Sequence, residues 1–315
     1  MDLTIAVLGP LAGPEARVAR PWVSAVRAAV QRHGPTFGGR MGVRTLDDCR
    51  DPGRTLTLIG RLIDDPDVVG VVGPKNSGGA LAVREFATEA GLPLLLPAAT
   101  ADELAGPGLL RLCAPDAATA RAAAELALDL DVRGLWVEAD ATPYGSRLAT
   151  AVRAATAQVG ITLTEHIGEA DAAFLAMGEV EQARRMGEHR RADFRGHLMG
   201  AEGGPGAAIG MLAGDAAEGA WQLYAGTPVP AQTHVYTAEA VAATEALLHA
   251  YEATMDRTAI SAWLRSRDRG TLPSIFGPLS FDATGQRERA RVSVWRIQRG
   301  RAVRQPARRS VSAKA

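Results

Sequence analysis

The sequence predicts an α/β protein of two doubly wound lobes, each built on a mostly parallel sheet. Two observations predict this class. Short apolar runs alternate with longer amphipathic stretches along most of the chain, which is the pattern of strands joined by crossover helices. The chain has 315 residues, of which 47% are hydrophobic, and this supplies two cores of ordinary domain size.

The first part of the chain contains compact apolar runs, each followed by a segment with apolar residues at helical spacing. The helices are expected to end at glycine or proline signals such as Gly34-Pro35 and Gly91. Strands are predicted at Leu3–Leu8, Val43–Leu46, Val68–Val72, Leu92–Leu96 and Leu109–Cys113. Helices are predicted at Ala16–His33, Arg54–Ile63 and Ser77–Ala90.

The second part continues the alternation and then changes to strand pairs near Leu279–Asp282 and Arg291–Gln298. Strands are predicted at Gly134–Glu138, Ile161–His166, Ala172–Ala176, His197–Met199 and Gly219–Tyr224. Helices are predicted at Ala117–Leu130, Tyr144–Val159, Val180–His189, Ala207–Leu212, Glu239–Thr254 and Ala259–Ser266. The basic tail Arg299–Ala315 shows no periodicity, so we expect it to be loosely held.

Composition excludes several classes of partner. Lys+Arg and Asp+Glu are both 35, so no charge excess attracts nucleic acid or an anionic membrane. No apolar run approaches the roughly 18 residues of a membrane span. The first residues lack a basic segment, an apolar core and a cleavage site. As written, the chain is therefore expected in the cytoplasm, or outside it if an export signal has been removed.

Catalytic signatures are absent from the sequence. There is no phosphate loop, no dinucleotide fingerprint, no nucleophile elbow and no H-E-x-x-H zinc spacing. The acidic residues Asp47, Asp48 and Asp51 follow a predicted strand, where a solvated polar loop is favoured over a metal site. We therefore expect no cofactor, no metal and no enzymatic activity.

Two kinds of local evidence suggest a ligand site. Ser77 opens a predicted helix, where a hydroxyl and free N–H groups form a natural anion site. Thr100 follows the carboxyl end of the next strand, where open α/β sheets bind ligands. We therefore predict that these two residues hold a ligand carboxylate.

Eight segments, which follow one another in the family's order, carry a family resemblance that covers nearly the whole chain. They are Ile5–Pro14, Val69–Gly78, Ala90–Thr100, Leu110–Leu112, Pro143–Gly145, Met199–Gly203, Ala217–Gly219 and Phe276–Gly285. They match patterns such as G-P-x-[ST]-G, V-x-G-P-x-x-S and G-P-[IL]-x-F-D-x-x-G. In these segments the chain resembles the leucine/isoleucine/valine-binding protein family, which has the type I periplasmic-binding-protein fold.

The resemblance implies a solute-binding protein that closes two lobes around an amino acid, as the receptor of a branched-chain-amino-acid-type ABC importer. It implies a three-crossing hinge, expected near Arg111–Pro115, Leu223–Pro228 and Phe276–Asp282. The expected lobes are 1–113 with 228–278 and 114–227 with 279–300, followed by a loosely ordered tail at 301–315. The expected partners are a small-molecule ligand and either an ABC permease or a regulatory protein.

The resemblance also assigns the other end of the ligand. The backbone carbonyl of Ala98 and the carboxylate of Glu202 are expected to take the ammonium, and Tyr144 is expected to close over the ligand. Structural alternatives remain open for these side chains. Ser77 suits a helix cap, Thr100 a turn, Tyr144 a packed aromatic, and Glu202 a solvated carboxylate.

Lys75 stands just before Ser77 and is the only lysine besides Lys314. We hypothesise that its ammonium reaches a second anionic group on the ligand, such as a distal carboxylate. The alternative is an ordinary surface ammonium, because lysines are rarely buried.

The chain departs from the family at three places, one of which is the lack, after Phe174, of the aromatic that usually lines the side-chain pocket. The cysteine that family members often pair with the Cys49 position is replaced by Asn76, so that disulfide cannot form. The link Ile167–Asp171 is too short for the helix that the family carries there, which predicts a trimmed second lobe. A cytoplasmic ligand sensor with the same fold, an enzyme on a doubly wound fold and a ligandless scaffold remain the alternative functions.

Overall fold

The computed structural model describes residues 3–13, 16–229, 234–268 and 270–306. The chain divides into two compact units: unit 1 comprises Met1–Ala114 and Gly226–Arg291, and unit 2 comprises Pro115–Ala225 and Val292–Ala315. The chain therefore passes between the units three times.

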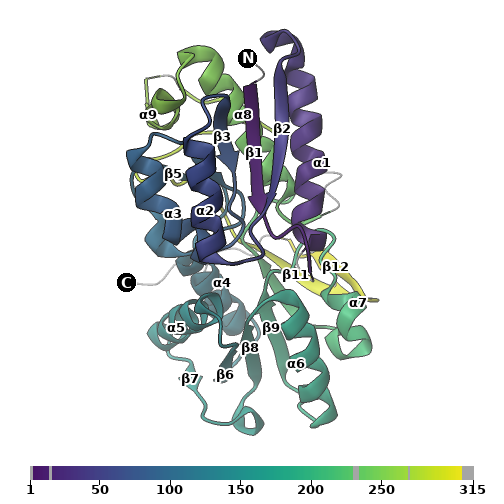
Figure 1. The fold of residues 1–315 in the computed structure, drawn as a ribbon. Coiled ribbons are helices and arrows are strands. Elements are labelled where there is room, and N and C mark those ends of the chain that lie inside the picture. Colours follow the sequence, from purple (N-terminus) through teal and green to yellow (C-terminus); the bar gives the residue numbers. More distant parts are fainter. Residues whose placement is uncertain (1–2, 14–15, 230–233, 269, 307–315) are drawn as a thin grey trace. The chain divides into compact units, whose positions relative to one another are not determined.

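Unit 1 contains a five-stranded parallel sheet in the order β2-β1-β3-β4-β5 (Figure 1). Its strands are β1 (Leu3–Gly9), β2 (Met41–Asp47), β3 (Val68–Val72), β4 (Leu94–Leu96) and β5 (Leu109–Arg111). Every residue of β3, β4 and β5 is buried, as expected for parallel strands covered on both faces. The carboxyl ends of β3, β4 and β5 consequently lie side by side at one edge of this sheet.

Helices cover the sheet of unit 1. They are α1 (Ala16–His33), α2 (Pro52–Ile63), α3 (Ser77–Glu89), α8 (Thr237–Thr254) and α9 (Ile260–Arg265). Apolar residues of α2 and α3, including Ile59 and Val83, form one core with β1, β3 and β4. The other long pair, α1 and α8, packs together, and α8 contacts β3 and β4.

Unit 2 contains a seven-stranded sheet in the order β12-β11-β10-β9-β8-β6-β7. Its strands are β6 (Gly134–Ala139), β7 (Thr162–Leu163), β8 (Ala172–Ala176), β9 (His197–Ala201), β10 (Trp221–Tyr224), β11 (Ser293–Gln298) and β12 (Arg301–Arg304). The strands from β7 to β10 are parallel, whereas β10, β11 and β12 pair antiparallel. Together the two sheets make the molecule an α/β protein with mostly parallel strands, as the sequence predicts.

The helices of unit 2 bury both faces of its sheet. They are α4 (Asp116–Asp129), α5 (Pro143–Gln158), α6 (Glu179–Arg191) and α7 (Ile209–Ala213). One core joins α4 and α5 to Phe174 and Met199, and a second joins α6 and α7 to Leu175 and Leu198. Within the part of the chain that the structure describes, no helix is long and apolar enough to cross a membrane.

The third crossing differs from the expected one. It follows Arg291 instead of lying near 276–282, so residues 279–291 belong to unit 1. The reason is pairing with β5: the N–H of Arg111 donates to the carbonyl of Gly285, and the N–H of Arg287 donates to the carbonyl of Arg111. The strand expected at Leu279–Asp282 is present only as isolated bridges.

Two further expectations concern unit 2. The loosely ordered tail is wrong for its first four residues, because they form β12, which pairs with β11. From residue 307 on, the predicted tail lies outside the described residues. The short link before β8 holds one 3₁₀ turn, Ile167–Glu169, which agrees with a lobe that lacks the family's helix there.

Candidate functional site

The carboxyl edge of the unit 1 sheet brings Ser77 and Thr100 together. Ser77 is the first residue of α3, which follows β3, and Thr100 lies in the loop after β4. The hydroxyl oxygen of Ser77 accepts the backbone N–H groups of Thr100 (3.1 Å) and Ala101 (3.2 Å). Ser77 and Thr100 are only 6% and 4% exposed, so the hydroxyl is removed from bulk water. Ala98 lies in the same loop and is 9% exposed.

Ser77 does not cap the helix. The N-cap of α3 is Asn76, and no side chain makes a capping hydrogen bond there. The capping interpretation of Ser77 is therefore wrong. A serine hydroxyl has two acceptor lone pairs and one donor, and both lone pairs accept backbone N–H groups here. The hydroxyl is left to act as a donor.

Arg111 lies behind this loop, at the end of β5. One nitrogen of its guanidinium, Nη1, donates to the carbonyl oxygens of Thr100 (3.2 Å) and Ala101 (2.5 Å), and Nε donates to the amide oxygen of Gln286 (2.5 Å). From the sequence, Arg111 is expected only as part of a hinge strand. The available signal was an arginine among the apolar residues Leu109, Leu110 and Leu112.

Lys75 is buried, with only 8% of its surface exposed, so its interpretation as a surface ammonium is wrong. Its charge acts on the carboxyl of Asp48, which is 1% exposed. Burial raises the pKa of Asp48, although the N–H of Arg50 and the charge of Lys75 work in the opposite direction. Whether Lys75 reaches a ligand stays a prediction.

The neighbouring acidic residues bind backbone groups. Asp47 accepts the N–H groups of Leu11 and Cys49, and Asp51 accepts the N–H of Arg54 at the start of α2. The described residues contain no cluster of three or more His, Cys, Asp or Glu side chains that could hold a metal ion. The hydrogen bonds of Asp47 and Asp51 are those of a polar loop, but Asp48 is buried and not solvated as expected.

Unit 2 brings Tyr144 and Glu202 together. Tyr144 lies in the first turn of α5 and Glu202 directly follows β9, and the phenol donates to Oε1 of Glu202 at 3.1 Å. Burial of the phenol, with the nearby charges of Glu202 and Asp116, raises the pKa of Tyr144. The hydroxyl therefore stays protonated and remains a donor at neutral pH.

Local packing fixes the Glu202 loop. Glu202 itself has a left-handed backbone with φ of 70°. Gly203 and Gly204 follow. A Cβ on Gly203 would lie 2.1 Å from Cβ of Gln222, and a Cβ on Gly204 would lie 2.7 Å from the ring of Tyr224. Only glycine allows the loop to approach β10 so closely.

Gln182 of α6 connects the two loops on this side of unit 2. Its Nε2 donates to the carbonyl oxygens of Met177 (2.7 Å) and Ala201 (2.5 Å). Met177 directly follows β8, and Ala201 is the last residue of β9, just before Glu202. The side chain is fully buried. The sequence does not predict a role for Gln182, because a glutamine in an otherwise polar helix gives no signal of burial.

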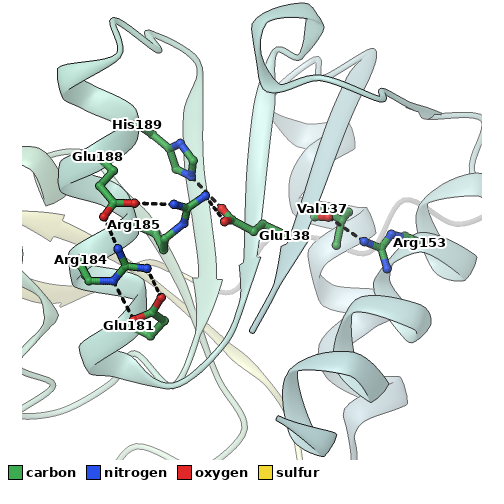
Figure 2. Close-up of polar contacts among 8 residues, drawn as sticks. All are labelled: Val137, Glu138, Arg153, Glu181, Arg184, Arg185, Glu188 and His189. Atoms are coloured by element: carbon green, nitrogen blue, oxygen red, sulfur yellow. Dashed lines mark hydrogen bonds and ion pairs between the residues drawn. The ribbon is translucent and has the colours of Figure 1, made fainter. Parts of the chain in front are cut away.

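A separate charged cluster ties α6 to β6 (Figure 2). Glu138 accepts from Arg185 and from Nε2 of His189, the latter at 2.8 Å, and Arg185 also contacts Glu188. Burial by itself raises the pKa of Glu138, but the hydrogen bonds from His189 and Arg185 hold it below its ordinary value. The partners in this cluster are all side chains of unit 2, which indicates a structural role.

The two half-sites differ in charge. The edge of unit 1 contains the buried cations Lys75 and Arg111 near Ser77, whereas unit 2 surrounds Tyr144 with the carboxylates of Glu202 and Asp116. Each predicted pair thus forms within its own unit. That the two pairs act on one ligand remains our prediction.

Comparisons with known proteins concern the family and the fold of the chain. Residues 2–182 match the model of a family described as periplasmic binding protein. The Leu/Ile/Val-binding protein BraC3 of Rhizobium johnstonii is 30% identical over 168 residues, which cover 51% of this chain and 46% of the relative. The chain therefore matches about half the length of this relative.

Solved structures share the fold. The leucine-binding protein LivK of Thermotoga maritima superposes with a TM-score of 0.86 at 20% identity, covering 96% of this chain and 98% of that one. A solute-binding protein from an ABC transporter of R. palustris, crystallised with benzoate, gives a TM-score of 0.81 at 16% identity, covering 96% of this chain and 95% of that one. These likenesses confirm the predicted fold class.

Proposed function

Because this chain belongs to the periplasmic binding protein family, we propose that it is the solute receptor of an ABC importer and that its ligand is an amino acid. In this proposal each unit contributes one half-site. Unit 1 takes the carboxylate of the ligand and unit 2 takes the ammonium. The names of its relatives support the same class of ligand, since BraC3 is a Leu/Ile/Val-binding protein.

The donor-only state of Ser77 is the observation that carries the proposal. Because its two lone pairs accept N–H groups from Thr100 and Ala101, its hydroxyl can offer only a proton to a ligand. A carboxylate oxygen accepts such a proton, whereas an ammonium cannot. Leucine and benzoate, named for two structural neighbours, both carry a carboxylate.

Unit 2 presents the complementary chemistry. Glu202 accepts a hydrogen bond from the hydroxyl of Tyr144 on one oxygen, and a carboxylate can accept several hydrogen bonds at once, including those of an ammonium. The Asp116 carboxyl adds negative charge near the same phenol. An ammonium is costly to desolvate unless it is paired, and this half-site supplies the pairing.

Lys75 sets the choice of side chain in this proposal. A distal carboxylate on the ligand would meet its buried ammonium, which favours dicarboxylic over monocarboxylic amino acids. Titration of a Lys75→Ala variant with L-glutamate and L-leucine tests this role. Equal losses of affinity for both probes would remove Lys75 from side-chain recognition.

A thermal-shift screen against amino acids tests the function. A ligand at about 100 times its dissociation constant stabilises the folded protein by about 2.7 kcal/mol. For a unit of this size, each kcal/mol corresponds to roughly 2–4 °C in Tm. We expect at least one amino acid to raise Tm by several degrees, and a Ser77→Ala, Glu202→Gln double variant to lose the shift.

A screen in which no amino acid raises the Tm of well-folded protein would count against amino-acid binding.

Cell fractionation tests transport against sensing. We place the protein outside the cytoplasm, as the periplasmic family to which it belongs suggests. Recovery of the native gene product solely in the cytoplasm would favour the sensor.

A further inference from the structure

Arg111 is a buried cation whose hydrogen-bond acceptors among the described residues are all uncharged. The residue is 5% exposed at the end of β5, and its guanidinium donates to two backbone carbonyls and to the amide oxygen of Gln286. A buried charge is costly unless it is compensated. Neutral acceptors satisfy its hydrogen bonds but leave the net charge in place.

A hydrogen-bond chain runs from Arg111 to Ser77 through one peptide group. The carbonyl of Thr100 and the N–H of Ala101 belong to the same planar peptide unit. Arg111 donates to the carbonyl end at 3.2 Å, and the N–H end donates to Oγ of Ser77 at 3.2 Å. Hydrogen bonds in such a chain polarise one another, so the guanidinium strengthens the Ala101 N–H as a donor.

The same arrangement affects the ligand-facing hydroxyl. Oγ of Ser77 loses electron density to two N–H donors, one of which is polarised by Arg111. Its remaining O–H proton is therefore a better donor to an anion. Nη1 of Arg111 also donates to the carbonyl oxygen of Ala101 at 2.5 Å, so it fixes the peptide group that follows Ala101 as well as the one that precedes it.

We propose that Arg111 is the positioning and charge-selecting residue of the unit 1 half-site: it holds the Thr100–Ala101 peptide against Ser77 and supplies the positive charge that a ligand carboxylate compensates. The proposal rests on the function proposed above and deepens it. It assigns the preference for a carboxylate over a neutral acceptor to a residue behind the ligand-facing loop.

A purely structural role is the rival explanation. Nε of Arg111 also binds Gln286, whose Nε2 donates to the carbonyl of Cys113 at 2.9 Å, so Arg111 helps to anchor the returning segment beside β5. Loss of that anchor would weaken all ligands alike. The charge-selecting role instead predicts a selective loss for anionic ligands.

Matched variants separate the two roles. Arg111→Gln removes the charge, and Arg111→Lys keeps the charge but is too short to hold both carbonyls. Arg257→Gln is the control, because Arg257 also binds backbone carbonyls of unit 1, those of Ile63 and Asp65, outside the half-site. Circular dichroism and Tm establish that each variant is folded.

Calorimetric titration uses two probe pairs that differ only at the α-carboxylate: L-leucine with L-leucinamide, and L-glutamate with L-isoglutamine. We expect the unmodified protein to prefer the acid of at least one pair. In Arg111→Gln that acid-to-amide preference should fall by about 10–100-fold, the worth of a charge-assisted contact. Arg111→Lys should keep the preference, and Arg257→Gln should leave it unchanged. A folded Arg111→Gln variant that retains it within twofold overturns the charge-selecting role.

Amide hydrogen exchange tests the positioning role without any ligand. The N–H of Ala101 should exchange at least about tenfold faster in Arg111→Gln and in Arg111→Lys than in the unmodified protein or Arg257→Gln. Unchanged exchange in either Arg111 variant overturns the positioning role. If the unmodified protein binds none of the four probes, the proposed function and the charge-selecting role fail together, while the exchange rates still decide the positioning role.

Discussion

Replacing Ser77 with alanine removes one oxygen that performs two tasks. The oxygen accepts the N–H groups of Thr100 and Ala101, both buried, at 3.1 and 3.2 Å. Each buried donor left without an acceptor costs about 1–3 kcal/mol, so the free energy of unfolding should fall by about 2–6 kcal/mol. Loss of the hydroxyl proton also removes a hydrogen bond to a charged group, worth about 1.5–3 kcal/mol, which corresponds to roughly 10–150-fold weaker binding of a carboxylate ligand.

Urea unfolding measures the stability term, and calorimetric titration with L-leucine and L-glutamate measures the binding term. Thr244→Val is the matched control. Thr244 is a fully buried hydroxyl in α8 of the same unit, and its hydroxyl bonds only to a carbonyl one helical turn earlier. Neither role of the Ser77 oxygen holds if Ser77→Ala unfolds at the same urea concentration as the unmodified protein and binds both probes with unchanged affinity.

Three predictions concern unit 2. Glu138→Gln should lower the free energy of unfolding at pH 7, and this loss of stability should become smaller on acidification. The pKa of Glu138 is lower in the folded than in the unfolded state, so its stabilisation is present above the unfolded-state pKa and disappears as pH falls through the folded-state pKa. Urea unfolding between pH 3 and 7 measures this dependence. Gln182→Met should leave the carbonyls after β8 and at the end of β9 without their donor, which lowers stability by about 1–3 kcal/mol each and weakens binding, seen by calorimetry as a larger dissociation constant. Gly204→Ala should lower the free energy of unfolding by about 1–3 kcal/mol, because the new methyl group overpacks against the Tyr224 ring. Gly168→Ala is the control and should change Tm little, because no atom lies within 4 Å of its new Cβ. Equal Tm values for the two variants would contradict this packing effect.

Elements with strong local signals were predicted well from the sequence. The bounds of α1 and β3 agree with the structure, because helical spacing ends at Gly34-Pro35 in one case and a β-branched run ends at Gly73-Pro74 in the other. The pair Ser77–Thr100 was also within reach, since both residues lie at the carboxyl ends of the neighbouring parallel strands β3 and β4. The pair Tyr144–Glu202 came only from the family resemblance, because β8 separates the strands β6 and β9 that these residues follow.

The remainder depends on partners far away in the sequence. Strand β12 has only four residues, three of them exposed, and it exists because β11 offers a free edge. The guanidinium of Arg111 donates a hydrogen bond to the amide oxygen of Gln286, which is distant in the chain. Lys75 is buried near Asp48, which no spacing rule connects to it. Such contacts are properties of the tertiary structure and leave no local pattern.

The discontinuous path of the chain has a consequence for biosynthesis. Unit 1 receives α8 only after all of β6 to β10 has been translated, yet α8 packs on α1, and Trp22 of α1 donates to the carbonyl of Val235 just before α8. A nascent chain that ends before Thr237 therefore exposes the apolar face of α1 until the ribosome delivers its cover. Neither unit corresponds to a contiguous gene fragment, so dissection of this protein requires a circularly permuted or two-piece expression strategy.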